Sequence, residues 1–102
     1  MNKYHARRTY SELCDRVFDS LAEARRGEEL HLLEITGWIS DLRYQVKFKL
    51  CDVPKITITI DFAYLEDGKR VFEDTKGVLT RDTRTKLAWL KEKHGISVLL
   101  TK

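Results

Sequence analysis

The sequence predicts a small single domain of the α/β (α+β) class, with the element order α-β-β-β-α-β. Three observations support this class: partial alternation of apolar residues over 38–64, a hairpin signal at Asp67-Gly68, and helical spacing of apolar residues on both sides of this region. The chain has 102 residues, 42% of them hydrophobic and 34% charged, which is typical of one ordered globular core with an ionised surface. We therefore expect a mixed sheet flanked by helices.

The first helix is predicted over residues 19–36. Asp19 and Ser20 are both suitable N-caps, and Glu23 follows Ser20 at the spacing of a capping box. Gly37 then provides a natural C-terminal stop. This helix is expected to precede the sheet.

Three strands are predicted to follow, over residues 38–51, 56–64 and 71–76. The second is the clearest, because isoleucine and aromatic residues occupy every other position along it. Asp67-Gly68 is a strong signal for a two-residue hairpin between the second and third strands. These two strands are therefore expected to be antiparallel neighbours.

A second helix and a final strand complete the predicted domain. Leucine and threonine residues recur at helical spacing over residues 80–94, and His94-Gly95 is a suitable helix end. Residues 96–101 form a short β-branched and apolar run. The chain contains no internal repeat or low-complexity tract.

Two acidic residues of the predicted hairpin are candidates for a metal site. If the loop is symmetric about Asp67-Gly68, Asp61 lies opposite Asp74, and Lys76 lies two residues further on the same face. Opposed like charges destabilise a sheet, so a cation is expected, and paired carboxylates suit Mg²⁺. The alternative is a solvated sheet edge with Lys76 as an ordinary salt-bridge partner, but the pattern around Asp61 is that of an interior strand, where a charge is costly. Glu73 points to the other face and is expected to be structural.

Three further polar residues have two interpretations each. Glu23 either serves only the capping box, or faces the sheet together with Gly27 and Leu30 and supplies a third carboxylate. Gln45 and Lys47 share one face of the first predicted strand. They either hold water or phosphate or form the polar side of an amphipathic strand.

Basic residues indicate where phosphate groups would bind. The net charge is +3 and the pI is 8.9, which by themselves do not establish a nucleic-acid partner. Two groups are candidate DNA contacts: Lys3, Arg7 and Arg8 in a basic arm over residues 1–8, and Arg81, Arg84 and Lys86 around the start of the second helix. A solvated terminus and a solvated helix face are the alternatives.

The sequence lacks the patterns that are typical of several other functional classes. Cys14 and Cys51 have no spacing that supports a zinc site or a disulfide framework, and we expect reduced thiols. No Ser-His-Asp pattern, Gly-rich phosphate loop or HExxH motif points to acyl transfer or nucleotide hydrolysis. There is no apolar run of about 18 residues and no signal segment, so no membrane is expected and the predicted location is the cytoplasm.

The acidic residues and their order resemble those of the PD-(D/E)XK nuclease superfamily: Ile60-Asp61, then a hairpin, then Glu73-Asp74-Thr75-Lys76. The resemblance is closer to a family of small phage-encoded endonucleases in that superfamily, and it covers nearly the whole chain. It is carried by Lys3-Tyr4-His5, Phe18-Asp19-Ser20, Glu23 to Arg26, Ile39 to Leu42, Gln45, Phe48, Leu50, Asp61-Phe62 and Glu73 to Gly77. One departure is that isoleucine and not proline precedes Asp61.

This resemblance implies a restriction-endonuclease-like core similar to that of Holliday-junction resolvases. It implies that Asp61 and Asp74 bind Mg²⁺, with Mn²⁺ as a substitute, and that Lys76 orients or activates the attacking water. Glu23 would complete the catalytic and metal-binding cluster, and Gln45 would be an auxiliary polar residue of the same site.

The predicted function is metal-dependent hydrolysis of DNA phosphodiester bonds in phage DNA recombination or repair. A chain of 102 residues has no room for an added base-reading module, so we expect selectivity for branched or flapped DNA, cut by a possible homodimer in the host cytoplasm. The alternative is a catalytically silent nuclease fold that binds DNA or protein. The intact Asp61, Asp74 and Lys76 set argues against it.

Overall fold

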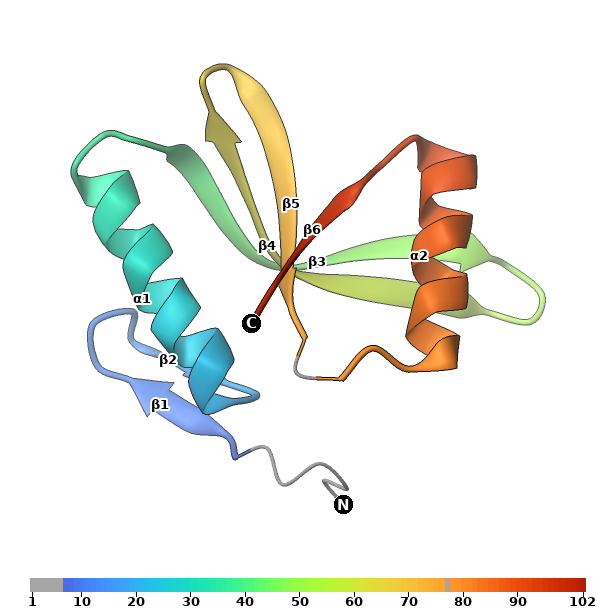
Figure 1. Cartoon of the computed structure of the whole chain (residues 1–102), viewed down its shortest axis with the longest axis horizontal. Coiled ribbons are helices and arrows are strands. Elements are labelled where there is room, and N and C mark those ends of the chain that lie inside the picture. Colours follow the sequence, from blue (N-terminus) through green and yellow to red (C-terminus); the bar gives the residue numbers. More distant parts are fainter. Residues whose placement is uncertain (1–6, 77) are drawn as a thin grey trace.

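The structure, a computed structural model, describes residues 7–76 and 78–102. Two helices and six strands lie within these ranges (Figure 1). In chain order they are β1 (Thr9–Ser11), β2 (Arg16–Phe18), α1 (Leu21–Ile35), β3 (Ser40–Cys51), β4 (Ile56–Glu66), β5 (Lys69–Thr75), α2 (Arg81–His94) and β6 (Val98–Thr101).

The α+β class is confirmed, and the order α-β-β-β-α-β is present from α1 onward. The four-stranded sheet has the order β3-β4-β5-β6 and is mixed, since only β5 and β6 are parallel. β1 and β2 form a separate antiparallel hairpin before α1, which was not predicted. Each of these strands has three residues, too few for an alternating pattern to be recognised.

Both predicted helices are present, with slightly later starts. α1 begins at Leu21 because Ser20 is the N-cap, and its hydroxyl accepts a hydrogen bond from Glu23 N at 3.0 Å. α2 is capped by Thr80 and is followed by Gly95, whose φ of 68° is left-handed. Glycine adopts this conformation without strain, so the helix ends where the sequence predicts.

The β4–β5 hairpin has the register of a symmetric loop. Phe62 pairs with Glu73 and Glu66 pairs with Lys69. The ladder stops at Phe62, so the predicted opposition of Asp61 and Asp74 is not a ladder pair. The predicted strand ends also shift: β3 starts at Ser40, β4 continues to Glu66, β5 starts at Lys69 and stops at Thr75, and β6 starts at Val98.

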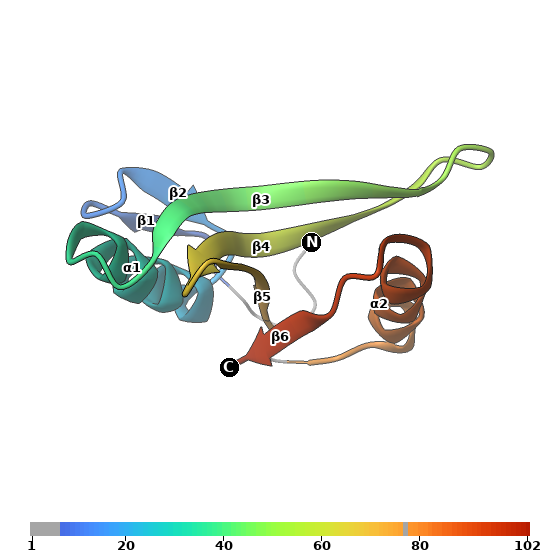
Figure 2. The same cartoon turned by 90° about the horizontal axis from the view of Figure 1, so that it is seen from above.

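β4 contributes to two hydrophobic clusters, one under each helix. Ile60 packs in the cluster that contains Leu90 of α2, whereas Phe62 packs in the cluster that contains Leu30 of α1. The two helices lie at opposite ends of the long β3–β4 hairpin (Figure 2). Asp61 is the residue between Ile60 and Phe62 and therefore lies where β4 passes from one cluster to the other.

α1 approaches β2 closely at Gly27. A Cβ atom at this position would lie 2.6 Å from Cζ of the Phe18 ring, and Phe18 is buried in the core with 2% of its surface exposed. A larger residue would push α1 away from the β1–β2 hairpin. This contact fixes the helix that carries Glu23 and Arg26.

Candidate active site

Asp61 and Asp74 converge where β4 and β5 separate. Asp61 N donates a hydrogen bond to Asp74 Oδ1, and Thr75 N donates one to Asp61 Oδ2, each at 2.9 Å. The carboxylates thus take the place of the ladder hydrogen bonds that end at Phe62. Asp61 is 8% exposed and Asp74 is 1% exposed. The structure therefore brings the two predicted acids together in a buried position.

Lys76 lies beside this pair. Its Nζ atom is 2.9 Å from Asp74 Oδ2, and its side chain is 30% exposed. This ion pair is the one polar contact of the buried Asp74 Oδ2 among the described residues. A carboxylate oxygen has two lone pairs and can accept more than one contact, so Asp74 Oδ2 can also take a bound cation.

Glu23 and Gln45 form the other side of the site. Glu23 is 5% exposed, and its Oε2 accepts a hydrogen bond from Gln45 Nε2 at 3.1 Å. Gln45 has a φ of 53°, and the β3–β4 ladder omits it between two regular pairs. Only the Ser20 half of the predicted capping box is present, because the Glu23 backbone N donates to Ser20 Oγ while the Glu23 carboxylate faces the sheet and bonds Gln45.

The three carboxylates do not form a preassembled metal cage. Within residues 7–76 and 78–102, no three His, Cys, Asp or Glu side chains lie close enough to hold one ion together. Asp61 and Asp74 are the close pair, and Glu23 lies beyond them and contacts Gln45. Two carboxylates suffice for Mg²⁺ in nucleic-acid enzymes, because it keeps several waters and takes substrate oxygens as further ligands.

Burial and neighbouring charges raise the pKa values of two acids of the site, Asp61 and Glu23. Burial, together with the adjacent Asp74 carboxylate, raises the pKa of Asp61 to about 8. Burial and the charges of Asp19 and Asp74 raise the pKa of Glu23 to about 7. Burial alone would lower the pKa of Lys76, but its ion pair with Asp74 and the other two acids raise it. The single positive charge of Lys76 is therefore too little to keep all three acids ionised at neutral pH.

Asp61→Asn is expected to stabilise the metal-free protein at alkaline pH. The folded pKa of Asp61, about 8, exceeds the unfolded value of about 3.9. The folded state therefore binds more protons between about pH 4 and 8, and wild-type stability falls as pH rises through this window. Asparagine retains an acceptor for Thr75 N without the charge.

Thermal melts in chelator at pH 5 and pH 8.5 test this expectation. The variant should melt several degrees above wild type at pH 8.5, on a scale of about 4–8 °C per kcal/mol, and the gap should shrink at pH 5. Asp61→Ala is the control, since it also removes the acceptor for Thr75 N and should melt lower. An Asp61→Asn protein that melts below wild type at pH 8.5 contradicts the repulsion argument.

The predicted basic residues lie in different places. Lys3 is outside the described residues, and Arg7 is exposed. Arg8 lines a hollow of about 230 Å³ together with Arg16, Glu23 and Gln45, so it borders the candidate site. The other predicted contacts are on the first turns of α2: Arg81 and Arg84 are exposed, and Lys86 lies 3.6 Å from Asp82.

Arg16 is a site residue that the sequence pattern did not identify. Its guanidinium carbon lies 3.9 Å from the centre of the Tyr44 ring, a cation–π contact that holds it in place. It shares the hollow with Glu23, and its charge lowers the pKa of Glu23 against the larger raising effects. The sequence contains no signal for a role of Arg16 in the site, because β2, the strand that carries it, was not predicted.

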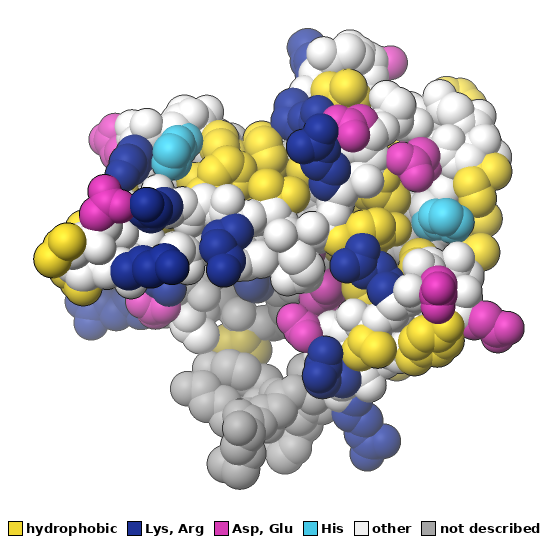
Figure 3. All heavy atoms as spheres, turned by 180° about the vertical axis from the view of Figure 1, so that it is seen from behind, with side chains coloured by type: hydrophobic (Ala, Val, Ile, Leu, Met, Phe, Trp, Pro, Cys, Tyr) yellow, Lys and Arg dark blue, Asp and Glu magenta, His cyan; other side chains and the backbone are white. Residues whose placement is uncertain are grey.

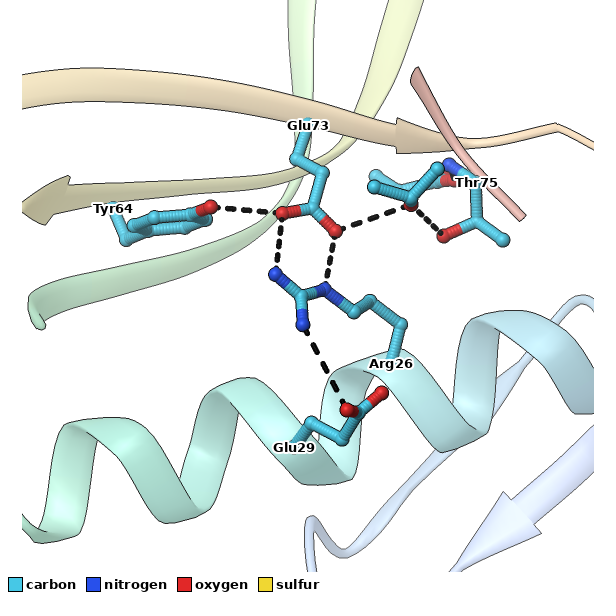
Figure 4. Close-up of polar contacts among 7 residues, drawn as sticks. Arg26, Glu29, Tyr64, Glu73 and Thr75 are labelled. Carbon is cyan, nitrogen blue, oxygen red and sulfur yellow. Dashed lines mark hydrogen bonds and ion pairs between the residues drawn. The ribbon is translucent and has the colours of Figure 1, made fainter. Parts of the chain in front are cut away.

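Glu73 lies on the opposite face of β5 and is fully buried. Arg26 of α1 donates two hydrogen bonds to it, from Nε at 2.6 Å and from Nη2 at 3.0 Å (Figure 4). The Tyr64 hydroxyl donates a third at 2.8 Å and the Thr101 hydroxyl a fourth at 3.2 Å. Glu73 therefore has its hydrogen bonds satisfied within the protein, in contrast to the neighbouring Asp74.

No helix within the described ranges is long and apolar enough to cross a membrane.

Comparison with known proteins identifies a family. No curated protein and no solved structure is significantly similar to the chain. One family model, described as "Protein of unknown function (DUF1064)", matches residues 1–98. Since this match spans nearly the whole sequence, the chain belongs to the DUF1064 family.

Proposed function

We propose that this protein is a Mg²⁺-dependent DNA endonuclease that hydrolyses phosphodiester bonds. The observation that carries the proposal is the buried pair of carboxylates, Asp61 and Asp74, at the point where β4 and β5 separate. One of their oxygens, Asp74 Oδ2, is contacted among the described residues by the Lys76 ammonium alone. Lys76 and Glu23 lie beside the pair, in the roles that the resemblance to PD-(D/E)XK nucleases implies for them.

Asp61 and Asp74 are the residues that would hold the cation, and Mn²⁺ would serve in place of Mg²⁺. An ion held there would supply Lewis-acid chemistry, namely polarisation of the phosphate and a more acidic coordinated water. This fit rests on the donor set, since both side chains offer hard oxygen ligands, and on Asp74 Oδ2, whose one polar contact among the described residues is the Lys76 ammonium.

The remaining residues of the site have separable roles in the proposed reaction. Lys76 keeps its proton, because its pKa is raised, so it acts as a fixed positive charge that attracts a phosphate oxygen and orients water. Glu23, with a pKa of about 7, exchanges a proton near neutral pH, as a general acid or base requires. Gln45 holds the Glu23 carboxylate in position through its 3.1 Å hydrogen bond.

The substrate and setting are part of the same proposal. Branched or flapped DNA is the preferred substrate, because the basic residues proposed to contact DNA suit phosphate groups, which carry no base sequence. A homodimer would place two sites on paired strands. Phage DNA processing in the host cytoplasm is the setting that the endonuclease resemblance implies.

Cleavage is expected with Mg²⁺ or Mn²⁺, whereas Ca²⁺ should support DNA binding with little turnover. The reason is that Ca²⁺ is larger and takes looser geometry than the octahedral arrangement Mg²⁺ demands. Labelled linear, nicked, flapped and four-way-junction DNA, incubated with each cation and with chelator, provides the measurement. Equal cleavage in chelator would overturn the proposed metal dependence, and binding without cleavage in every cation would favour a non-catalytic DNA-binding module.

A further inference from the structure

The β3–β4 hairpin extends beyond the candidate site and has two different faces. On one face, Leu50 and Ile58 are buried in the cluster beneath α2. On the other face, Lys47 pairs with Thr59 and Lys49 pairs with Thr57. Both lysines are exposed and both threonines are half-buried. We call the surface formed by Lys47, Lys49, Thr57 and Thr59 the arm face.

The arm face and the hairpin tip are positively charged. Between Val46 and Ile60 the chain has three cations, Lys47, Lys49 and Lys55, and one acid, Asp52. Figure 3 shows Lys and Arg side chains gathered along the limb that this hairpin forms. Lys49 is 2.8 Å from Asp52.

Two of these cations are available for an external partner. Within the described part of the chain, neither Lys47 nor Lys55 forms an ion pair. Lys55 also lines a hollow of about 340 Å³ between the hairpin tip and α2, whose polar lining is completed by Thr57, Thr85 and the Asp82–Lys86 ion pair. Lysine ammonium and threonine hydroxyl groups are common phosphate ligands.

The arm face leads directly to the candidate site. Strand alternation places Thr57, Thr59 and Asp61 in one series along β4. At about 3.3 Å per residue, Thr59 lies about 7 Å and Thr57 about 13 Å along the strand from Asp61. Since a DNA strand advances 3.4 Å per nucleotide along the helix axis, 13 Å corresponds to about four base pairs.

We propose that the arm face and Lys55 bind the DNA backbone on one side of the scissile phosphate, over about four to six base pairs. The partner is DNA because the surface combines spaced positive charges with hydroxyl groups and ends at the proposed hydrolytic site. This inference rests on the proposed function, which identifies DNA as the partner. Its test measures DNA binding alone and does not depend on cleavage.

The test compares two double variants of equal charge. Lys47→Ala with Lys55→Ala removes the two unpaired arm cations, and Lys69→Ala with Lys91→Ala removes two exposed cations elsewhere. Binding of labelled flapped DNA is measured in Ca²⁺ and in chelator between 50 and 200 mM salt. Thermal melts check that both variants are folded.

The arm variant should bind about tenfold more weakly at 100 mM salt, and the slope of log affinity against log salt should fall by about 1–2, since each phosphate contact contributes about 0.9. The control variant should keep the wild-type slope.

The two proposals fail in different ways. Equal affinities and slopes for the two double variants, or a wild-type protein that does not bind DNA, overturn the arm proposal. A selective loss of binding in the arm variant supports it even if wild type cleaves nothing in Mg²⁺, and that second result would overturn only the endonuclease proposal.

Discussion

Asp74→Asn is expected to abolish metal-dependent DNA cleavage without loss of metal-free stability. The substitution removes a carboxylate that would hold the cation, and loss of one preorganised electrostatic group in an active site costs about 10²–10³-fold in rate. Asparagine Oδ1 can still accept the hydrogen bond that Asp61 N donates at 2.9 Å. The substitution also removes the Asp74 charge that helps to raise the pKa of Asp61, and Lys76, at 30% exposure, can turn its ammonium toward water.

The matched control for this prediction is Asp67→Asn. Asp67 is an exposed turn residue with a φ of 52°, and asparagine tolerates this left-handed conformation as well as aspartate. Both variants make the same change in charge and size. Cleavage should fall at least about 100-fold in Asp74→Asn and stay at the wild-type rate in Asp67→Asn. Loss of stability in chelator for Asp74→Asn would identify Asp74 as a structural residue.

Local signals were sufficient to predict most of the fold. The Asp67-Gly68 turn determines the β4–β5 register, because a two-residue loop leaves only one symmetric pairing. Helix ends followed from the caps, with Ser20 and Gly95 in the expected roles. The β1–β2 hairpin escaped prediction because its strands are three residues each. The sequence therefore predicted a basic N-terminal arm over residues 1–8 but no strands between this arm and α1.

The candidate site was predictable only in part. The approach of Asp61 to Asp74 followed from the register, but the break in the ladder at this point did not. That break is accompanied by two hydrogen bonds from backbone N–H groups to carboxylates, from Asp61 N to Asp74 and from Thr75 N to Asp61. No pattern of residue types encodes these contacts. Contacts between elements distant in sequence, such as Arg16 on Tyr44, were equally inaccessible.

The Arg26–Glu73 pair is the clearest case of such a long-range contact and has a large expected effect on stability. Arg26→Met is expected to lower the free energy of unfolding by about 3–5 kcal/mol, the cost of leaving a buried charge without its partner. Glu73 has no exposed side-chain surface, and it would retain only the hydroxyl groups of Tyr64 and Thr101. Urea unfolding at pH 7.5 measures the change.

Two further variants separate the buried pair from the surface charges around it. Glu29→Gln removes the other acid near Arg26, which lies 3.9 Å away and is 65% exposed, and should cost no more than about 1 kcal/mol. Glu73→Gln in the Arg26→Met background should recover most of the loss, because a neutral amide still bonds the Tyr64 and Thr101 hydroxyls. If Arg26→Met costs less than about 1 kcal/mol, Glu73 is neutralised by a proton or reached by water, and the pair does not fix α1 against β5.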